Sequence, residues 1–581
     1  MLYYNSNLLK YLYILLLSFL PIFLFACYLF ILTIHNEATK YFLLNDDSLS
    51  LPLMLRDLYS GNFSFFLWND YNQTLFYPDI IIYGLVNKIL AYNEFLTSLF
   101  YPIAIFCIQI YLLFFIFKNQ YKYILFLIII SLLLSLSILV YYLNDHEMLT
   151  IGSLKSNNPI VWLFMHNHTG NLLNMSFAYI LYSHKSFQIR YSLTQLTFLI
   201  HVGLAIYSNL FFLIHFSLPI IILEFYYLTK GMNRNNSIIY LLLCFFIGWI
   251  LSNGMLVNYP STKINVIGFF DNAYLLIQYN LSLMILICLN ISIYIYYKKN
   301  LNFLLCYNLL VLSLCILFNK YLPKYLLPVY FVNIFLICNT LSMKNYFNLK
   351  KIKSLMIFIL FVFISFIFIM TISMYKTASV RLLNYTPSYV ECIKNFKIKN
   401  DLNNGISSYG FSKKFTFFGD GSYIVDFTKY LSPWFWGNNT NWYLNKKFDY
   451  IIDFIPHNKT VEPYTFHQPN IKSILGKKYK KQVFKCNDLS LIGYFVDFNI
   501  MENKNLKKSI NQHLNVTFFD RLKENTFFIK MMISKYLNLK HFFVKTYLNL
   551  KYYVVRINKK LNQDSYNVLD LLKEIVKRIF I

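Results

Sequence analysis

The chain has 581 residues, of which 57% are hydrophobic, 20% are aromatic and only 14% are charged, and its mean hydropathy is +0.46. A soluble protein would carry roughly 25% charged residues, so the composition excludes an ordinary soluble enzyme and favours a helical membrane protein. The net charge of +27 is spread over short loops and the C-terminal tail, which indicates contact with anionic lipid and not nucleic-acid binding.

The first 375 residues predict an all-α polytopic membrane domain with about eleven transmembrane helices, because uncharged runs near the spanning length of about 20 residues follow one another. The runs lie near residues 11–34, 98–117, 123–143, 169–184, 193–208, 209–227, 237–257, 273–297, 302–319, 325–343 and 354–375. The stretch 193–227 is long for one span and short for two, and Ser208 and Asn209 predict a turn between its halves.

Charges in the connecting loops predict the orientation. Connections such as KNQYK at 118–122 and TKGMNRNN at 229–236 are basic and hold no acid, whereas the opposite loops hold the acids. The positive-inside rule therefore places the N-terminus in the cytoplasm and, with an odd number of spans, the region after residue 375 outside it. We expect an integral membrane protein of a bacterial inner membrane.

The first outer loop, residues 35–97, opens with two adjacent acids, Asp46 and Asp47, just beyond the first predicted span. Asp is favoured at helix N-caps, so the pair could simply begin a helix. Two amphipathic stretches follow in the same loop, and the second, FYPDIIIYGLVNKIL, carries Asp79 near its start. A carboxylate that is partly desolvated at the lipid boundary has the raised basicity that a general base needs.

A second outer loop brings Asp145, His146 and Glu147 to the same side, and His166 and His168 follow in the sequence LFMHNHTGN. Oxygen and imidazole ligands of this kind would suit Mg²⁺ or Mn²⁺. The alternative is a polar loop whose histidines bind backbone groups, since a lone His-x-His pair is a weak signal.

Beyond residue 375 the composition changes. Residues 376–500 contain Gly, Pro and short alternating stretches such as KFTFFGDGSYIVDF and KFDYIIDFIP, which predict a small mixed α/β domain. Cys392 and Cys486 could form a disulfide there if the domain is outside the cytoplasm. Trp434, Trp436 and Trp442, in an aromatic segment at 430–444, could stack on sugars, belong to the core or form an aromatic belt at the interface. Residues 501–581 predict a tail of basic amphipathic helices on the bilayer surface.

This layout resembles the GT-C class of glycosyltransferases, polytopic membrane enzymes that use sugars linked to lipid phosphates. The likeness covers the chain to about residue 500: one span, an acidic pair at its outer end, a long outer loop, further spans and an outer C-terminal domain. The sequence YLPKYLLPVY at 321–330 is also similar to the Arg/Lys-Tyr-x-x-Pro element of the mannosyl- and arabinosyltransferase-like branches, with Lys324 as the cation.

The resemblance implies a role for each charged group. Asp46 or Asp47 would be the base that deprotonates an acceptor hydroxyl, and the other would orient the acceptor or help to hold a divalent metal. Lys320, Lys324 and Arg381 would bind the phosphate of a polyprenyl-phosphate-linked sugar donor. The acceptor would be an extracytoplasmic glycan, lipid or protein, and membrane lipid would be the other partner.

Two other functions stay open. An envelope glycan polymerase or ligase would also be polytopic, although such proteins rely on outer-loop arginines and the outer loops before residue 376 hold essentially one, Arg56. A transporter or flippase would have broken helices and a repeated half, and no repeat is evident. The sequence has no P-loop and no GxGxxG, GxSxG or HExxH motif, so nucleotide-driven transport and soluble nucleotide-sugar transfer find no support.

Overall fold

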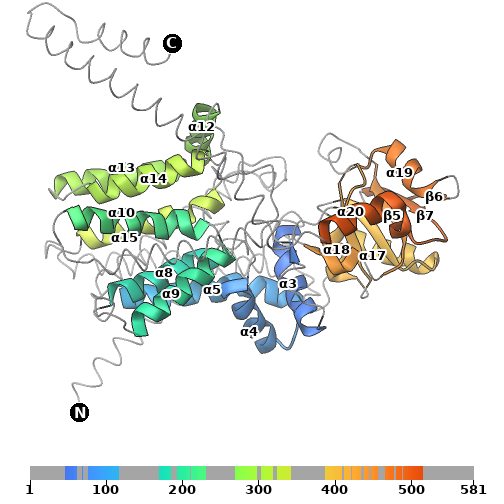
Figure 1. Cartoon of the computed structure of the whole chain (residues 1–581), viewed down its shortest axis with the longest axis horizontal. Helices are drawn as coiled ribbons and strands as arrows, with labels where there is room; N and C mark the ends of the chain where they lie inside the picture. The colour runs from blue at the N-terminus through green and yellow to red at the C-terminus, as the bar shows by residue number, and fades with distance from the viewer. Residues whose placement is uncertain are drawn as a thin grey trace, which may run out of the picture. The chain divides into compact units, whose positions relative to one another are not determined.

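The computed structural model of the chain is mostly helical, with a sheet domain towards the C-terminus (Figure 1). It describes residues 46–61, 68–69, 76–116, 169–184, 193–209, 211–229, 268–297, 302–317, 323–341, 386–408, 411–419, 422–428, 430–433, 438–443, 446–455, 465–476, 479–486 and 489–514. All the described residues belong to one compact unit. The predicted spans at 11–34, 123–143, 237–257 and 354–375 lie outside the described residues, as does the tail beyond residue 514.

The first loop folds into short elements before the first long helix. These elements are α3 (Asp46–Tyr59), β1 (Trp68–Asn69), η1 (Phe76–Ile80) and α4 (Ile81–Ile89). The long helix α5 (Glu94–Ile116) then packs on α8 (Thr169–Ser183), and α8 packs on α9 (Leu193–Ser208). The turn predicted at Ser208 and Asn209 is present, because α9 ends at Ser208 and the Phe212 amide donates to the Asn209 carbonyl at 2.9 Å.

The remaining described helices of this part have between 5 and 19 residues. They are η4 (Leu213–Ser217), α10 (Leu218–Thr229), α12 (Phe269–Tyr279), α13 (Leu281–Tyr296), α14 (Asn302–Leu317) and α15 (Pro323–Leu341). Buried asparagine side chains join α13, α14 and α15. Asn290 Nδ2 donates to Asn333 Oδ1 at 3.0 Å, and Asn333 Nδ2 donates to Asn308 Oδ1 at 2.8 Å. Polar side chains that bond across helices in an apolar setting fix which faces meet.

The predicted fold class, an all-α protein with about eleven transmembrane helices, is wrong. In the described residues, one helix is long and apolar enough to cross a membrane, Glu94–Leu113, and a second counts only if α12 and α13 are one span bent by 85°. The other apolar helices that pass through the described residues, such as Leu193–Ser208 and Leu304–Leu317, have 10–17 residues there, fewer than the about 20 that a span needs. Hydropathy measures the length of an apolar run and does not show where the helix within it breaks, as at Asn280 in the predicted span 273–297.

A five-stranded sheet forms the core of the C-terminal domain, and helices gather around it (Figure 1). The strand order is β3 (Ile424–Phe427), β2 (Asn404–Ser408), β5 (Phe448–Phe454), β7 (Leu489–Phe495) and β6 (Lys480–Cys486). Strand β2 is parallel to both β3 and β5, whereas β7 is antiparallel to β5 and β6. The helices are α17 (Ser388–Lys399), α18 (Ser412–Phe418), α19 (Gln468–Leu475) and α20 (Lys504–Leu514).

The first loop and the sheet domain share one hydrophobic core. Leu49, Leu51 and Leu53 of α3 belong to the same buried cluster as Ile406 and Val425 of the sheet. Strand β1 of the loop also pairs antiparallel with β4 (Asn438–Asn439). Segments that the sequence assigned to separate domains, 35–97 and 376–500, are therefore packed together.

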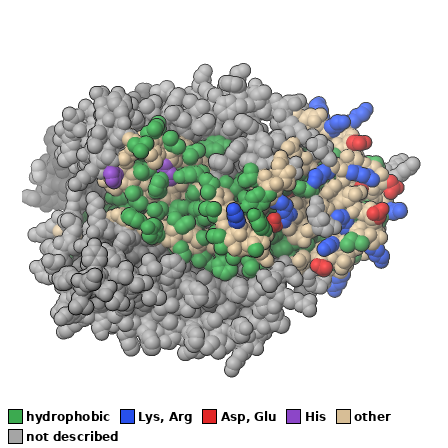
Figure 2. Space-filling model, turned by 90° about the horizontal axis from the view of Figure 1, so that it is seen from below, with side chains coloured by type: hydrophobic (Ala, Val, Ile, Leu, Met, Phe, Trp, Pro, Cys, Tyr) green, Lys and Arg blue, Asp and Glu red, His purple; other side chains and the backbone are tan. Residues whose placement is uncertain are grey.

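The described surface differs between the two parts. Exposed Lys, Arg, Asp and Glu gather over the sheet domain, whereas the helical part presents mostly hydrophobic side chains (Figure 2). Leu85, Ile89 and Tyr111 are examples of large apolar side chains left exposed there.

Candidate functional site of the first loop

Asp79, the carboxylate of the first loop's second helical stretch, is buried, with 5% of its surface exposed. The Tyr101 hydroxyl, on α5, donates to Asp79 Oδ1. The Gly170 amide, in the first turn of α8, also donates to the carboxylate. A Cβ built on Gly170 would overlap both carboxylate oxygens, so this close approach requires glycine. Amides in the first turn of a helix have no partner within the helix and favour an anion.

The environment of Asp79 moves its protonation into the neutral range. Burial raises the pKa of the carboxyl from its ordinary value near 3.8 to about 7, although hydrogen bonds from Tyr101, from the Asp79 backbone and from Gly170 act in the opposite direction. Near pH 7 the group can therefore accept and release a proton. A pKa near the working pH is what general acid–base catalysis requires.

The turn that carries Asp79 is locked between α8 and α9. The Tyr77 hydroxyl lies 2.8 Å from His201 Nδ1, and His201 Nε2 lies 3.0 Å from the Asn174 carbonyl oxygen. A carbonyl can only accept, so Nε2 carries the proton and the Tyr77 hydroxyl donates to Nδ1. The Tyr77 amide in turn donates to the Ser208 hydroxyl. These bonds hold the backbone two residues before Asp79 in place.

A second buried carboxylate, Asp57, joins α3 to the sheet domain. Its Oδ2 accepts from Asn439 Nδ2 at 2.6 Å and from Trp442 Nε1 at 3.0 Å. Asp57 is 1% exposed and Trp442 is 3% exposed. Trp442 is thus a core residue that hydrogen-bonds Asp57, and its ring is not open for stacking on a sugar.

Arg56, the neighbour of Asp57, contacts two other elements. Its Nη1 donates to the Thr416 carbonyl at 2.8 Å and its Nη2 to the Phe417 carbonyl at 2.9 Å, at the end of α18. Its Nε donates to Glu94 Oε1 at 3.2 Å, and Nη2 also reaches Glu94 Oε2, at the start of α5. One guanidinium therefore connects α3, α5 and α18.

Of the predicted catalytic, phosphate-binding and metal-binding residues, Asp79 is the one whose side chain the structure describes. Asp46 and Asp47 are the first two residues of α3, a position that Asp favours in any helix, and Lys324 lies in the first turn of α15; the side chains of all three lie outside the described part. Also outside it are Lys320, Arg381, Asp145, His146, Glu147, His166 and His168. The described residues hold no group of three potential metal ligands, and the metal site stays a prediction.

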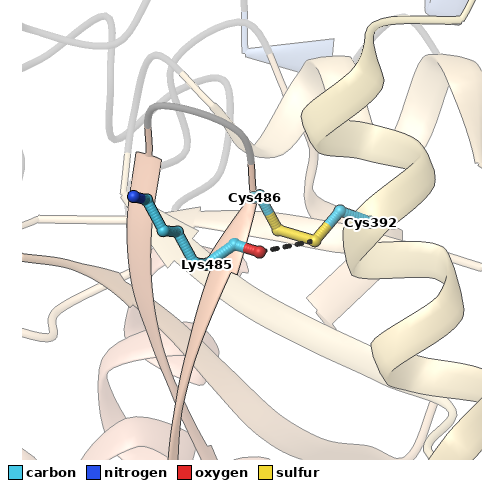
Figure 3. Close-up of a disulfide and its surroundings, with 3 residues drawn as sticks. All are labelled: Cys392, Lys485 and Cys486. Atoms are coloured by element: carbon cyan, nitrogen blue, oxygen red, sulfur yellow. Dashed lines mark hydrogen bonds between the residues drawn. A yellow bond between two sulfur atoms is a disulfide. The ribbon is translucent and has the colours of Figure 1, made fainter.

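Cys392 and Cys486 are joined by a disulfide, with their Cα atoms 5.7 Å apart (Figure 3). The bond links α17 to the end of β6, and the Lys485 carbonyl oxygen lies 3.7 Å from Cys392 Sγ. This is the pairing that the sequence offered as possible.

The partners of these acids are not evident in the sequence. Its motifs indicate Asp79 but not Tyr101 or Gly170, and Arg56 stands out there only as an outer-loop cation. A signal for Gly170 was available, because a glycine within TGNLLN at the start of an apolar helix indicates a close approach of another group.

The chain matches no protein-family profile, no curated protein and no solved structure. The resemblance to the GT-C class thus stays a prediction that depends on the residues quoted for it.

Proposed function

We propose that the protein is a membrane glycosyltransferase that moves a sugar from a polyprenyl-phosphate donor to an extracytoplasmic glycan, lipid or protein, with a first-loop carboxylate as general base. In this reaction the base takes the proton of an acceptor hydroxyl, and the acceptor oxygen forms a bond to the anomeric carbon. The bond from that carbon to the phosphate oxygen breaks, and polyprenyl phosphate leaves.

The observation that carries the proposal is the geometry of Asp79. A carboxylate on the first loop, enclosed by Tyr101 and Gly170 and held by a locked turn, is suited to receive a proton near neutral pH. Asp46 and Asp47 begin α3 in the same loop. The base is one of these three carboxylates.

The leaving phosphate requires positive charge nearby. Lys320, Lys324 and Arg381 are the proposed phosphate ligands, by the resemblance alone. Asp145, His146, Glu147, His166 and His168 are the residues proposed to hold Mg²⁺ or Mn²⁺, which would supply charge to the same phosphate.

The experiment compares membranes that contain the wild type, Asp46→Asn, Asp47→Asn or Asp79→Asn at matched expression, supplied with a polyprenyl-phosphate sugar. Loss of donor consumption in at least one variant, with thermal stability retained, is the expected result. Asp497→Asn is the matched control, because Asp497 is exposed on the sheet domain. Donor consumption at the wild-type level in all three first-loop variants would contradict the proposal.

One observation favours the flippase alternative. The 85° bend between α12 and α13 is the kind of break that transporters place near a substrate. The same assay separates the two functions, since a flippase moves the lipid-linked sugar without cleaving it.

A further inference from the structure

The sheet domain does more than cover the first loop, because the two are joined at several separate points. The buried Lys413 of α18 donates from Nζ to the Ser50 hydroxyl of α3 at 3.0 Å. Asp57 bonds Asn439 and Trp442, and β1 pairs with β4. Helix α3, which begins with Asp46, is therefore held along its length by the C-terminal domain.

Arg56 extends this attachment to α5. Its two carbonyl bonds satisfy oxygens at the C-terminal end of α18, where helix carbonyls lack partners and a cation is favoured. Its bonds to Glu94 fix the first turn of α5. Further along the same helix, α5 carries Tyr101, which bonds Asp79.

The two groups of first-loop carboxylates are thus connected through one side chain. Asp46 and Asp47 stand at the start of α3, ten and nine residues before Arg56, and Asp79 is held by α5. The ion pair with Glu94 is about one-third exposed on each side and alone adds little stability. The planar guanidinium of Arg56 bonds two carbonyls and a carboxylate at once, which the single ammonium group of a lysine could not do.

We propose that Arg56 is a positioning residue, through which the C-terminal domain holds the first-loop carboxylates at the spacing that sugar transfer requires. This inference rests on the proposed function. It assigns Arg56 no contact with substrate. Its effect should therefore fall on turnover, because a displacement of about 1 Å in a catalytic constellation can lower a rate by about a hundredfold.

The experiment combines Arg56→Lys with a cross-link that restores docking. Asn69 and Asn438 are directly opposed in the β1–β4 pair, and opposed residues in antiparallel strands have Cα separations within the disulfide range. The paired substitutions Asn69→Cys and Asn438→Cys, in the full chain, should therefore form a disulfide, which alkylation with a mass tag detects without any activity measurement. Lys507→Arg, the reverse exchange at an exposed site in α20, is the matched control.

The proposal predicts that Arg56→Lys lowers kcat by about tenfold or more with little change in KM, and that the engineered disulfide between positions 69 and 438 restores kcat. Reductant should abolish the restoration and leave Arg56→Lys without the cysteine pair unchanged. Turnover at the wild-type level in Arg56→Lys, or a complete cross-link that restores nothing, would overturn the positioning role. A further outcome concerns the double-cysteine protein that retains Arg56. If it cross-links fully, but neither it nor the wild type transfers sugar, the proposed function fails and the positioning role fails with it.

Discussion

Asp79→Asn should lower the rate of sugar transfer and, at neutral pH, stabilise the fold. The two effects have one cause, the desolvation that raises the pKa of Asp79 to about 7. Between its ordinary pKa near 3.8 and pH 7 the folded protein binds more protons at this site than the unfolded chain does. The stability of the wild type therefore falls as pH rises through this window, whereas the neutral amide of asparagine contributes no such dependence.

The magnitude follows from the two pKa values. For a carboxyl with pKa near 3.8 when unfolded and about 7 when folded, the penalty grows by about 2.5 kcal/mol between pH 5 and pH 8. The amide also loses one hydrogen bond, from Tyr101 or Gly170, at a cost of about 1 kcal/mol that does not vary with pH. The difference in free energy of unfolding between Asp79→Asn and the wild type should therefore be about 2.5 kcal/mol larger at pH 8 than at pH 5.

The assay is chemical denaturation of the full chain in detergent at pH 5 and pH 8, followed by tryptophan fluorescence. Asp497→Asn, which makes the same exchange at an exposed position of the sheet domain, is the control. If the difference in free energy of unfolding between Asp79→Asn and the wild type does not change with pH, the claim of a raised pKa is wrong. The Asp79 carboxyl of the folded protein would then titrate like an ordinary exposed one.

Two further variants test the contacts around the site. Gly170→Ala should displace the Asp79 carboxylate and lower the rate of sugar transfer by about tenfold or more. Gly203→Ala in α9 is the control and should leave the rate unchanged, because a Cβ there meets nothing within 4 Å. Equal rates in the two variants would contradict the close approach of Gly170 to Asp79. Asp57→Ala removes the acceptor of two buried donors and should destabilise the fold by about 2–5 kcal/mol, measured as a lower Tm in detergent. Asp497→Ala should lower Tm by much less, and similar losses in the two variants would show that Asp57 stabilises nothing beyond a surface acid.

The sheet domain was partly predictable. Strand β5 lies in KFDYIIDFIP, where alternation predicted a strand, and β3 ends the stretch KFTFFGDGSYIVDF. The start of that stretch is instead helix α18. Lys413 and Lys414 are both buried, so the alternation of polar and apolar residues did not correspond to an exposed and a buried face of a strand. Tertiary packing against α3 overrode the local pattern.

The candidate site was less predictable, because its partners are far apart in the chain. Asp79 bonds Tyr101 and Gly170, and Arg56 bonds carbonyls some 360 residues away. Every residue has a backbone carbonyl, so the sequence does not show which carbonyls accept hydrogen bonds from a side chain. No sequence pattern could therefore predict the contact of Arg56 with α18. The helix break at Asn280 is similarly hidden within a continuous apolar run, which explains why residues 273–297 were predicted as a single span.

The most direct test of the central claim is the release of polyprenyl phosphate by the purified wild-type protein in lipid nanodiscs, supplied with a polyprenyl-phosphate sugar and an extract of surface glycans, lipids and proteins. We expect one polyprenyl phosphate to be released for each sugar that becomes attached to an acceptor, and release to fall when Asp46, Asp47 and Asp79 are all replaced by asparagine. Release that is the same in the triple variant, or a donor that stays intact with every acceptor fraction, would contradict the account.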